Sequence, residues 1–287
     1  MIYPRAFAAG LFCLCATTGT AQDRPELLAA VDEPADAIAA NVAASGMTSV
    51  VEIDHSRLAE AAGVLMPPAR VILFSDPVIE APLLSENIRA GLDLPMRVLA
   101  YWEDEGPSVM YTGSDFLAAR HGLTNTEALA AFDTGVASVL DGVAAVAAPV
   151  DGLVLNYGVI ELQSPFDLAE TVDRLTSAVT SQGDTVWFGE VDFASDAASV
   201  GVELPQARLL LFGGPGPGGV AMADFVSIGL DAFCQKLLVY VDASGGVTVL
   251  FNGIAALAEL HYGMSAEPHA QLDARLTQTF RTALDID

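Results

Sequence analysis

The chain has 287 residues, of which 52% are hydrophobic, and a formal net charge of −25. Its length is sufficient for one large domain or two small domains with proper hydrophobic cores. The strong acidity makes nucleic acid and anionic membranes poor partners, because both would repel such a surface.

The first 21 residues have the pattern of a secretory signal peptide. Arg5 supplies the positive charge, residues 6–16 form an apolar run, and small residues precede a cleavage site after Ala21. Because this run is too short to cross a bilayer as a helix, we expect an exported, periplasmic protein without a membrane span. Cys234 then remains alone, and its apolar surroundings predict a buried side chain that behaves as a small hydrophobe.

Residues 22–123 are expected to form a first α+β repeat. A strand is expected near Glu26–Val31, and the spacing of Ile38 and Val42 predicts the helix that follows it. Further strands are expected at residues 49–53 and 70–74, a β-hairpin at 97–111, and a closing helix at 114–121 that Ser114 caps and Gly122 ends.

A connecting helix is expected in residues 124–150, because Thr124 and Glu127 form a capping box and the helical pattern continues to Ala148. The second repeat, residues 151–265, starts its first helix at Ser164 and Pro165. Its strands are expected at 153–162, 185–193 and 207–212, its hairpin at 236–251 and its closing helix at 254–262. The C-terminal segment, 266–287, is expected to form a last helix over 267–283.

The two halves of the chain are copies of one another. Residues 52–93 align without a gap on residues 190–231, at an offset of 138, and 14 of these 42 positions are identical. A repeat of this length and register indicates duplication of a domain. The pattern predicts an α+β fold in which each βαβββα-type unit has an antiparallel sheet with helices on one face, and the two units form an internal pseudo-dimer within a monomeric chain.

The segment "GGPGPGG" (residues 213–219) raises the question of a phosphate-binding loop. It lacks the Lys-Ser/Thr of such loops, and it aligns with "SDPVIEA" (residues 75–81), which contains no glycine. We therefore expect a turn at the end of a strand, with Pro77 and Pro215 in equivalent places.

Three segments carry a resemblance to a known family. "EIDH" (52–55), "LFSDP" (73–77) and "GLDLPMRVLAYWEDEG" (91–106) resemble the bacterial family called domain of unknown function 302. The resemblance covers both halves and implies a fold like that of the TATA-binding protein, with no DNA binding and no known activity. The first repeat keeps the family pattern better, since the second has Phe193 in place of His55.

The hypothetical ligand site therefore lies in the first repeat, at the ends of its strands. Its members are Asp54, His55, Asp76, Pro77, Asp93, Pro95 and Arg97. Asp54 and His55 could perform acid–base chemistry, but the alternative is that Asp54 or Ser56 caps a helix and His55 is exposed. Arg70 and Arg97 could bind an anionic ligand or form internal ion pairs, and the many carboxylates favour ion pairs.

The remaining histidines suggest either helix capping or metal binding. His121 and His261 occupy equivalent places in the last turn of the two closing helices, where capping is the favoured interpretation. His261, Met264 and His269 could suit copper, although their spacing matches no compact site.

The favoured function is a non-catalytic module that binds a small ligand or a protein partner, with no cofactor and no resident metal. One alternative is an enzyme that uses Asp54, His55 and Asp93 around a pocket. Another alternative is a periplasmic accessory protein for metal or redox chemistry.

Overall fold

The computed structural model describes residues 24–104 and 106–287, so the predicted signal peptide lies outside the described residues. The first repeat and the linker after it contain α1 (Arg24–Ser45), β1 (Thr48–Asp54), α2 (His55–Ala61), β2 (Ala69–Ser75), α3 (Pro77–Glu86), the 3₁₀ helix η1 (Ile88–Leu92), β3 (Met96–Glu103), β4 (Gly106–Tyr111), α4 (Ser114–His121), α5 (Thr126–Val139) and β5 (Val146–Ala147).

The second repeat has the same order of elements after one additional strand. It contains β6 (Val159–Ser164), α6 (Leu168–Thr180), β7 (Val186–Asp192), α7 (Phe193–Ser199), β8 (Ala207–Gly213), α8 (Pro215–Met222), η2 (Val226–Gly229), β9 (Gln235–Val241), β10 (Val247–Asn252), α9 (Ile254–Tyr262) and α10 (Glu267–Ala283). The predicted last two helices are confirmed.

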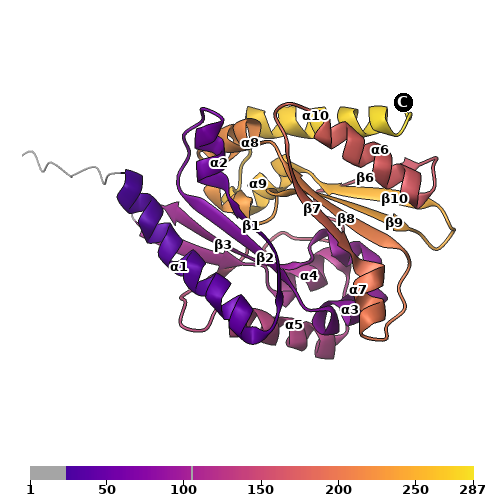
Figure 1. Cartoon of the computed structure of the whole chain (residues 1–287), viewed down its shortest axis with the longest axis horizontal. Coiled ribbons are helices and arrows are strands. Elements are labelled where there is room, and N and C mark those ends of the chain that lie inside the picture. The colour runs from indigo at the N-terminus through magenta and orange to yellow at the C-terminus, as the bar shows by residue number, and fades with distance from the viewer. Residues whose placement is uncertain (1–23, 105) are drawn as a thin grey trace, which may run out of the picture.

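Each repeat forms one five-stranded sheet, as the duplicated α+β fold predicts (Figure 1). The strand orders are β1-β2-β3-β4-β5 and β7-β8-β9-β10-β6, so four strands of each sheet are equivalent. Their registers also agree: Arg97 pairs with Leu73 in the first sheet, and Lys236 pairs with Leu211 in the second. These matching pairs confirm that the two halves repeat one structure.

The fifth strand differs between the two sheets. Six residues of β6 pair antiparallel with β10, whereas β5 has two residues and pairs parallel with β4. The predicted strand at Glu26–Val31 is wrong, because this segment belongs to α1. Val31 continues the buried face that Ala35, Ile38 and Val42 present to the sheet, so a helical pattern prevails over the expected strand.

Several helices and strands begin at other residues than predicted, because a turn residue or a different capping residue sets the boundary. The strand expected at 153–162 begins at Val159, because Asn156 and Gly158 adopt left-handed backbone conformations with φ of 58° and 61°. Helix α6 begins after Asp167, whose side chain accepts from the Glu170 N–H, and Ser164 ends β6 instead. Helix α4 has no side-chain cap of its own, since Ser114 donates to Asp133 of α5.

Helix α5 is shorter than predicted and ends at Val139. Asn125 caps it, while Thr124 donates to Glu86. It packs on α1, α3 and α4, so it belongs structurally to the first repeat, as α10 does to the second. The equivalent aspartates Asp133 and Asp273 accept backbone N–H groups at the starts of α4 and α9.

The glycine-rich segment forms helix α8, so the expected turn is wrong. Pro215 occupies the first turn, where its missing N–H costs nothing. A β-carbon on Gly219 would lie 2.6 Å from Cβ of Ala59 in α2. The glycines therefore allow α8 of the second repeat to approach α2 of the first very closely, and α3 packs on α7 in the reciprocal contact.

The two repeats pack against each other through one continuous core. Helix α1 covers the outer face of the first sheet, and α6 and α10 cover that of the second (Figure 1). The segments η1 and η2 each pack on the sheet of the other repeat. The larger hydrophobic cluster includes Val98 and Leu99 of the first sheet and Leu209 and Leu238 of the second. In the described chain, no helix is long and apolar enough to cross a membrane.

Candidate functional site

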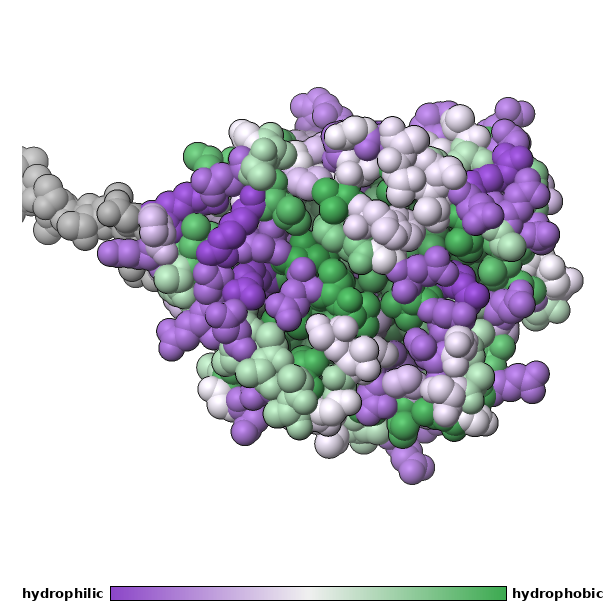
Figure 2. All heavy atoms as spheres, viewed as in Figure 1, coloured by the Kyte–Doolittle hydropathy of each residue, from purple (hydrophilic) through white to green (hydrophobic). Residues whose placement is uncertain are grey.

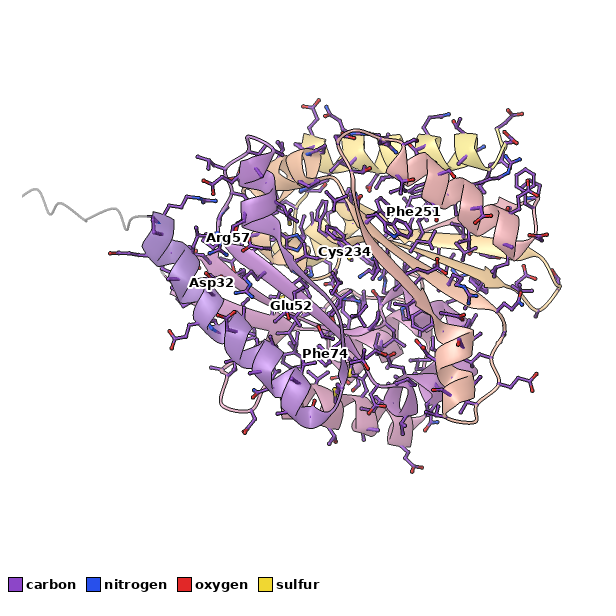
Figure 3. The ribbon with its side chains drawn as sticks, in the orientation of Figure 1. Asp32, Glu52, Arg57, Phe74, Cys234 and Phe251 are labelled. Carbon is purple, nitrogen blue, oxygen red and sulfur yellow. The ribbon has the colours of Figure 1, made fainter. Side chains whose placement is uncertain are left out.

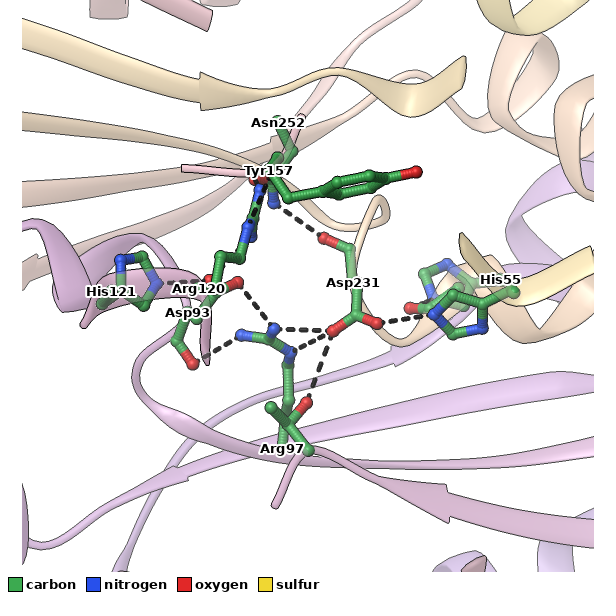
Figure 4. A network of polar contacts seen from close by, with 11 residues as sticks. His55, Asp93, Arg97, Arg120, His121, Tyr157, Asp231 and Asn252 are labelled. Atoms are coloured by element: carbon green, nitrogen blue, oxygen red, sulfur yellow. Dashed lines mark hydrogen bonds and ion pairs between the residues drawn. The ribbon is translucent and has the colours of Figure 1, made fainter. Parts of the chain in front are cut away.

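A buried charge network lies at the centre of the molecule, where the repeats meet (Figure 4). Asp93 follows η1 and Asp231 follows η2, and neither is exposed. Arg97 of β3 links them, with its Nη2 2.9 Å from Asp93 Oδ1 and 2.6 Å from Asp231 Oδ1. The predicted ion pair of Arg97 is thus present, and it joins the two copies.

The two equivalent histidines complete this network rather than cap their helices. His121 Nε2 lies 2.7 Å from Asp93 Oδ2, and His261 Nε2 lies 2.8 Å from Asp231 Oδ2. Glycines in left-handed conformation end both helices. The capping prediction is therefore wrong, because each imidazole turns inward to a buried carboxylate.

Arg120 is a member of the network that sequence reasoning missed. Its Nη1 lies 2.6 Å from Asp93 Oδ2, and its Nη2 lies 2.7 Å from Asn252 Oδ1 of the second repeat. Burial alone would raise the pKa of Asp93, but Arg120, His121 and Arg97 hold that pKa well below its ordinary value. Two carboxylates thus face two guanidinium groups, so the cluster is electrically compensated and holds the repeats together.

The other predicted site residues do not join this network. Asp54 accepts from the Arg57 N–H and pairs with the Arg57 guanidinium, so the expected helix cap is confirmed. Asp76 caps α3 by accepting from the Val78 N–H, and Pro77 is the first residue of that helix. Pro95 is buried just before β3. Within the described chain, Asp54 and Asp76 form hydrogen bonds with residues at the start of the helix that each one precedes.

His55 is buried, so the expectation that it is exposed is wrong. Its Nε2 lies 3.3 Å from the carbonyl oxygen of Gly229 in the second repeat. Burial is the main reason that the pKa of His55 falls to about 4. His55, Asp54 and Asp93 therefore contact three different sets of groups, which does not support the acid–base site proposed for them.

The aligned arginines Arg70 and Arg208 are used for internal pairing. Arg70 pairs with Asp32 and Asp36, and Arg208 pairs with Glu190. These contacts confirm the ion-pair interpretation for Arg70.

The copper hypothesis for the last histidines has no support in the geometry. His269 lies 2.9 Å from the Ala221 carbonyl oxygen, His261 binds Asp231, and Met264 is exposed. Within the described residues, no group of three or more His, Cys, Asp or Glu side chains is arranged to hold a metal ion.

An open groove lies in the first repeat, between β4, β5, α4 and α5. Its volume is about 490 Å³, within the range of small-molecule sites. Tyr111, Ser114, Asp115 and Asp133 supply its polar side chains, and Asp133 is already occupied by the start of α4. The remaining surface is mainly apolar, and its members include Phe116, Val136, Ala137, Leu140, Val143 and Ala147.

A second groove, of about 570 Å³, lies where η1 meets β9. Arg89 is its basic residue, but its guanidinium is 2.7 Å from Glu161 and 3.2 Å from the hydroxyl of Tyr240. The guanidinium of Arg89 is already paired, and Glu86 and Asp242 also line this groove. It is therefore a weaker candidate for a ligand site than the apolar groove.

A match to one protein family agrees with the duplication. The family model described as "Domain of unknown function DUF302" matches residues 26–140 and 160–283. A crystal structure of an uncharacterized conserved DUF302 protein from Bacillus stearothermophilus is 16% identical and covers 45% of this chain and 96% of its own, with a TM-score of 0.36.

Two curated proteins are similar over a shorter region. The fluoride-specific ion channel FluC 1 of Brucella suis biovar 1 and that of Brucella abortus biovar 1 are each 37% identical over 113 residues, or 38% of this chain. The chain spans 44% and 42% of the length of these relatives. Since the family model covers both halves, the chain belongs to the DUF302 family and carries two tandem copies of its domain.

Proposed function

We propose that the protein is an exported, non-catalytic binding module whose ligand is a small apolar molecule. The observation that carries this proposal is the groove of about 490 Å³ in the first repeat, with its mainly apolar lining. Apolar pockets with a few polar groups are the usual form of small-molecule sites. The half-buried Tyr111 could orient a polar end of the ligand.

The difference between the two sheets supports this location. In the second sheet, β6 covers the edge of β10 along six residues. In the first sheet, β5 covers only Met110 and Tyr111 of β4. The groove is lined by β5 and the linker around it, so it depends on the feature in which the first repeat departs from the second.

The acid–base groups of the molecule support binding rather than catalysis. Asp93 and Asp231 are fully engaged by buried partners, and Asp133 accepts two hydrogen bonds from Ser114. A catalytic acid or base needs access to its substrate within hydrogen-bond reach. Asp93 and Asp231 lie outside the lining of the described groove, and Asp133 within it is already engaged by Ser114.

Fluorescence of the neutral apolar dye Nile red tests the proposal. We expect saturable binding by the wild type, and loss of that binding in Ala137→Trp, because Ala137 is an exposed lining residue of α5 whose enlargement fills the groove. The control is Val78→Trp, an exposed position of α3 outside the groove. Equal dye binding by Ala137→Trp and the wild type would contradict this location.

Export is part of the same proposal and rests on the N-terminal sequence pattern. We expect the protein recovered from the periplasmic fraction to begin at Gln22, as intact-mass measurement would reveal. Recovery of the full-length chain from the cytoplasm alone would contradict it.

A further inference from the structure

A small pocket between the two repeats gathers three side chains with metal-binding donor atoms. His55, Met222 and Cys234 all line it, and its volume is about 20 Å³. A space of that size accommodates one water molecule or one monatomic ion. Figure 2 shows hydrophobic side chains gathered in the middle of the face that is viewed in Figure 1. Figure 3 places Cys234 near the centre of the same view.

The three donors come from separate elements that the pseudo-dimer brings together. His55 begins α2, Met222 ends α8, and Cys234 lies just before β9. A β-carbon built on Gly229 would lie 3.3 Å from His55 Cδ2 and 3.3 Å from Met222 Sδ. His55 Cδ2 and Met222 Sδ are therefore at most twice that distance apart. All three side chains are buried, with exposed fractions of 6%, 2% and 3%.

The duplicated structure has two equivalent places of this kind, and the three donors occur together in one of them. The equivalent residues are Phe193 for His55, Leu84 for Met222 and Pro95 for Cys234. Phe193 packs against Gly91 as His55 packs against Gly229, so the two places have the same architecture. Hydrocarbon groups are sufficient for that architecture in one copy, and packing alone therefore does not require a nitrogen and two sulfur atoms in the other.

The hydrogen bond of His55 is compatible with a role as a metal ligand. With the proton on Nε2, that N–H donates to the Gly229 carbonyl oxygen at 3.3 Å. The other nitrogen, Nδ1, then carries a lone pair and makes no hydrogen bond within the described part of the chain. Histidines that bind metals usually donate their second N–H to a carbonyl or carboxylate in this way.

We propose that His55, Met222 and Cys234 form a site for a single Cu(I) ion. Thiolate and thioether sulfur atoms, together with imidazole, are the donors that Cu(I) prefers. On binding, the sulfur–copper bond replaces the S–H bond of Cys234, and the thiol proton passes to solvent. The residues that line the described pocket include no carboxylate, which disfavours Mg²⁺ and Ca²⁺.

Anaerobic competition with the chromophoric chelator bicinchoninate tests the site in the reduced, signal-free chain, with Cu(I) supplied as its acetonitrile complex. We expect the wild type to withhold one Cu(I) per chain from the chelator. Cys234→Ser and His55→Phe should lose this equivalent, because each removes a ligand. His55→Phe introduces the residue that the second repeat has at this position.

The matched control is Met264→Leu, which alters an exposed methionine away from the pocket and should keep the full equivalent. Circular dichroism and thermal melting will verify that each variant is folded. For the wild-type complex, copper X-ray absorption should show sulfur scattering that disappears in Cys234→Ser. Failure of the wild type to compete for Cu(I), or undiminished competition by folded Cys234→Ser, would overturn the proposal.

Discussion

Asp93 holds in place the two arginines of the first repeat, Arg97 and Arg120, that contact the second repeat. It is fully buried and binds Arg97, Arg120 and His121. We expect Asp93→Asn to lower the free energy of unfolding by about 3–5 kcal/mol, because it leaves the buried guanidinium of Arg120 without its carboxylate partner. Urea denaturation measures this change, with the exposed Asp151→Asn as control. A loss no larger than that of the control would show that the network contributes little.

Glu80 should give the stability of the protein an unusual dependence on pH. Burial raises the pKa of Glu80 to about 8, against the lowering effect of hydrogen bonds from Ser75 and Met96. Between its ordinary value and 8, the folded state therefore binds more protons at this carboxyl than the unfolded state does. The contribution of Glu80 to stability consequently falls as pH rises through this range, by up to about 1.4 kcal/mol per pH unit.

The comparison of wild type with Glu80→Gln between pH 6.5 and 8 isolates this effect. In both proteins, His55 of the unfolded chain loses its proton near pH 6.5, and burial lowers the pKa of Lys236 in the folded chain to about 8. Both effects raise stability as pH rises and are common to the two proteins, so the difference between their curves reports Glu80. We expect the unfolding free energy of the wild type to fall relative to that of Glu80→Gln across this interval. Parallel curves for the two proteins would refute the assignment.

At the scale of elements, α8 shows that close packing can require glycine in a helix. Gly219→Ala should destabilise the protein by about 1–3 kcal/mol, since the new methyl group would collide with Ala59 in α2. Gly216→Ala is the control in the same helix, because its nearest neighbour would be 3.7 Å away. That change should stabilise by about 0.4–1 kcal/mol. Thermal unfolding of both variants provides the test, and equal shifts would contradict it.

The elements that sequence predicted correctly are those with strong local signals. Helix α10 and the hairpin strands β9 and β10 follow from periodicity and turn residues. Helix α8 could not be predicted in this way, because its stability depends on contact with α2, 160 positions away at Gly219 and Ala59. The extension of α1 into Glu26–Val31 was likewise obscured, since analogy with the other repeat suggested a strand.

The same limit applies to the sites. The sequence identified Asp93, Arg97 and His55 as notable, but it offered no means to pair Arg97 with Asp231 across the repeats. The importance of Asp133 could have been inferred from the sequence, because Asp273 occupies the equivalent place 140 residues later. Both aspartates accept backbone N–H groups at the start of a helix. The pocket around Cys234 depends on the docking of α2 and α8, so its donors are scattered along the chain.

At the scale of the whole molecule, the two repeats share one hydrophobic core and one charge network. One hydrophobic cluster includes Leu99 and Leu238 from facing sheets, and Arg97 joins the charges of both repeats. Separation of the halves would expose that apolar surface and leave Asp231 without its guanidinium partner. Such an interface is more like a domain core than a contact between independent domains.

A fragment test follows from this unity. We expect residues 22–150 and 151–287, produced separately, to lack cooperative thermal unfolding, and the intact chain without its signal peptide to unfold in one transition seen by both circular dichroism and tryptophan fluorescence. Mixing the halves should restore structure, because each supplies the missing face and counter-charges of the other. If each half unfolds cooperatively alone at the temperature of the intact chain, the shared core and the Arg97 bridge do not couple the repeats.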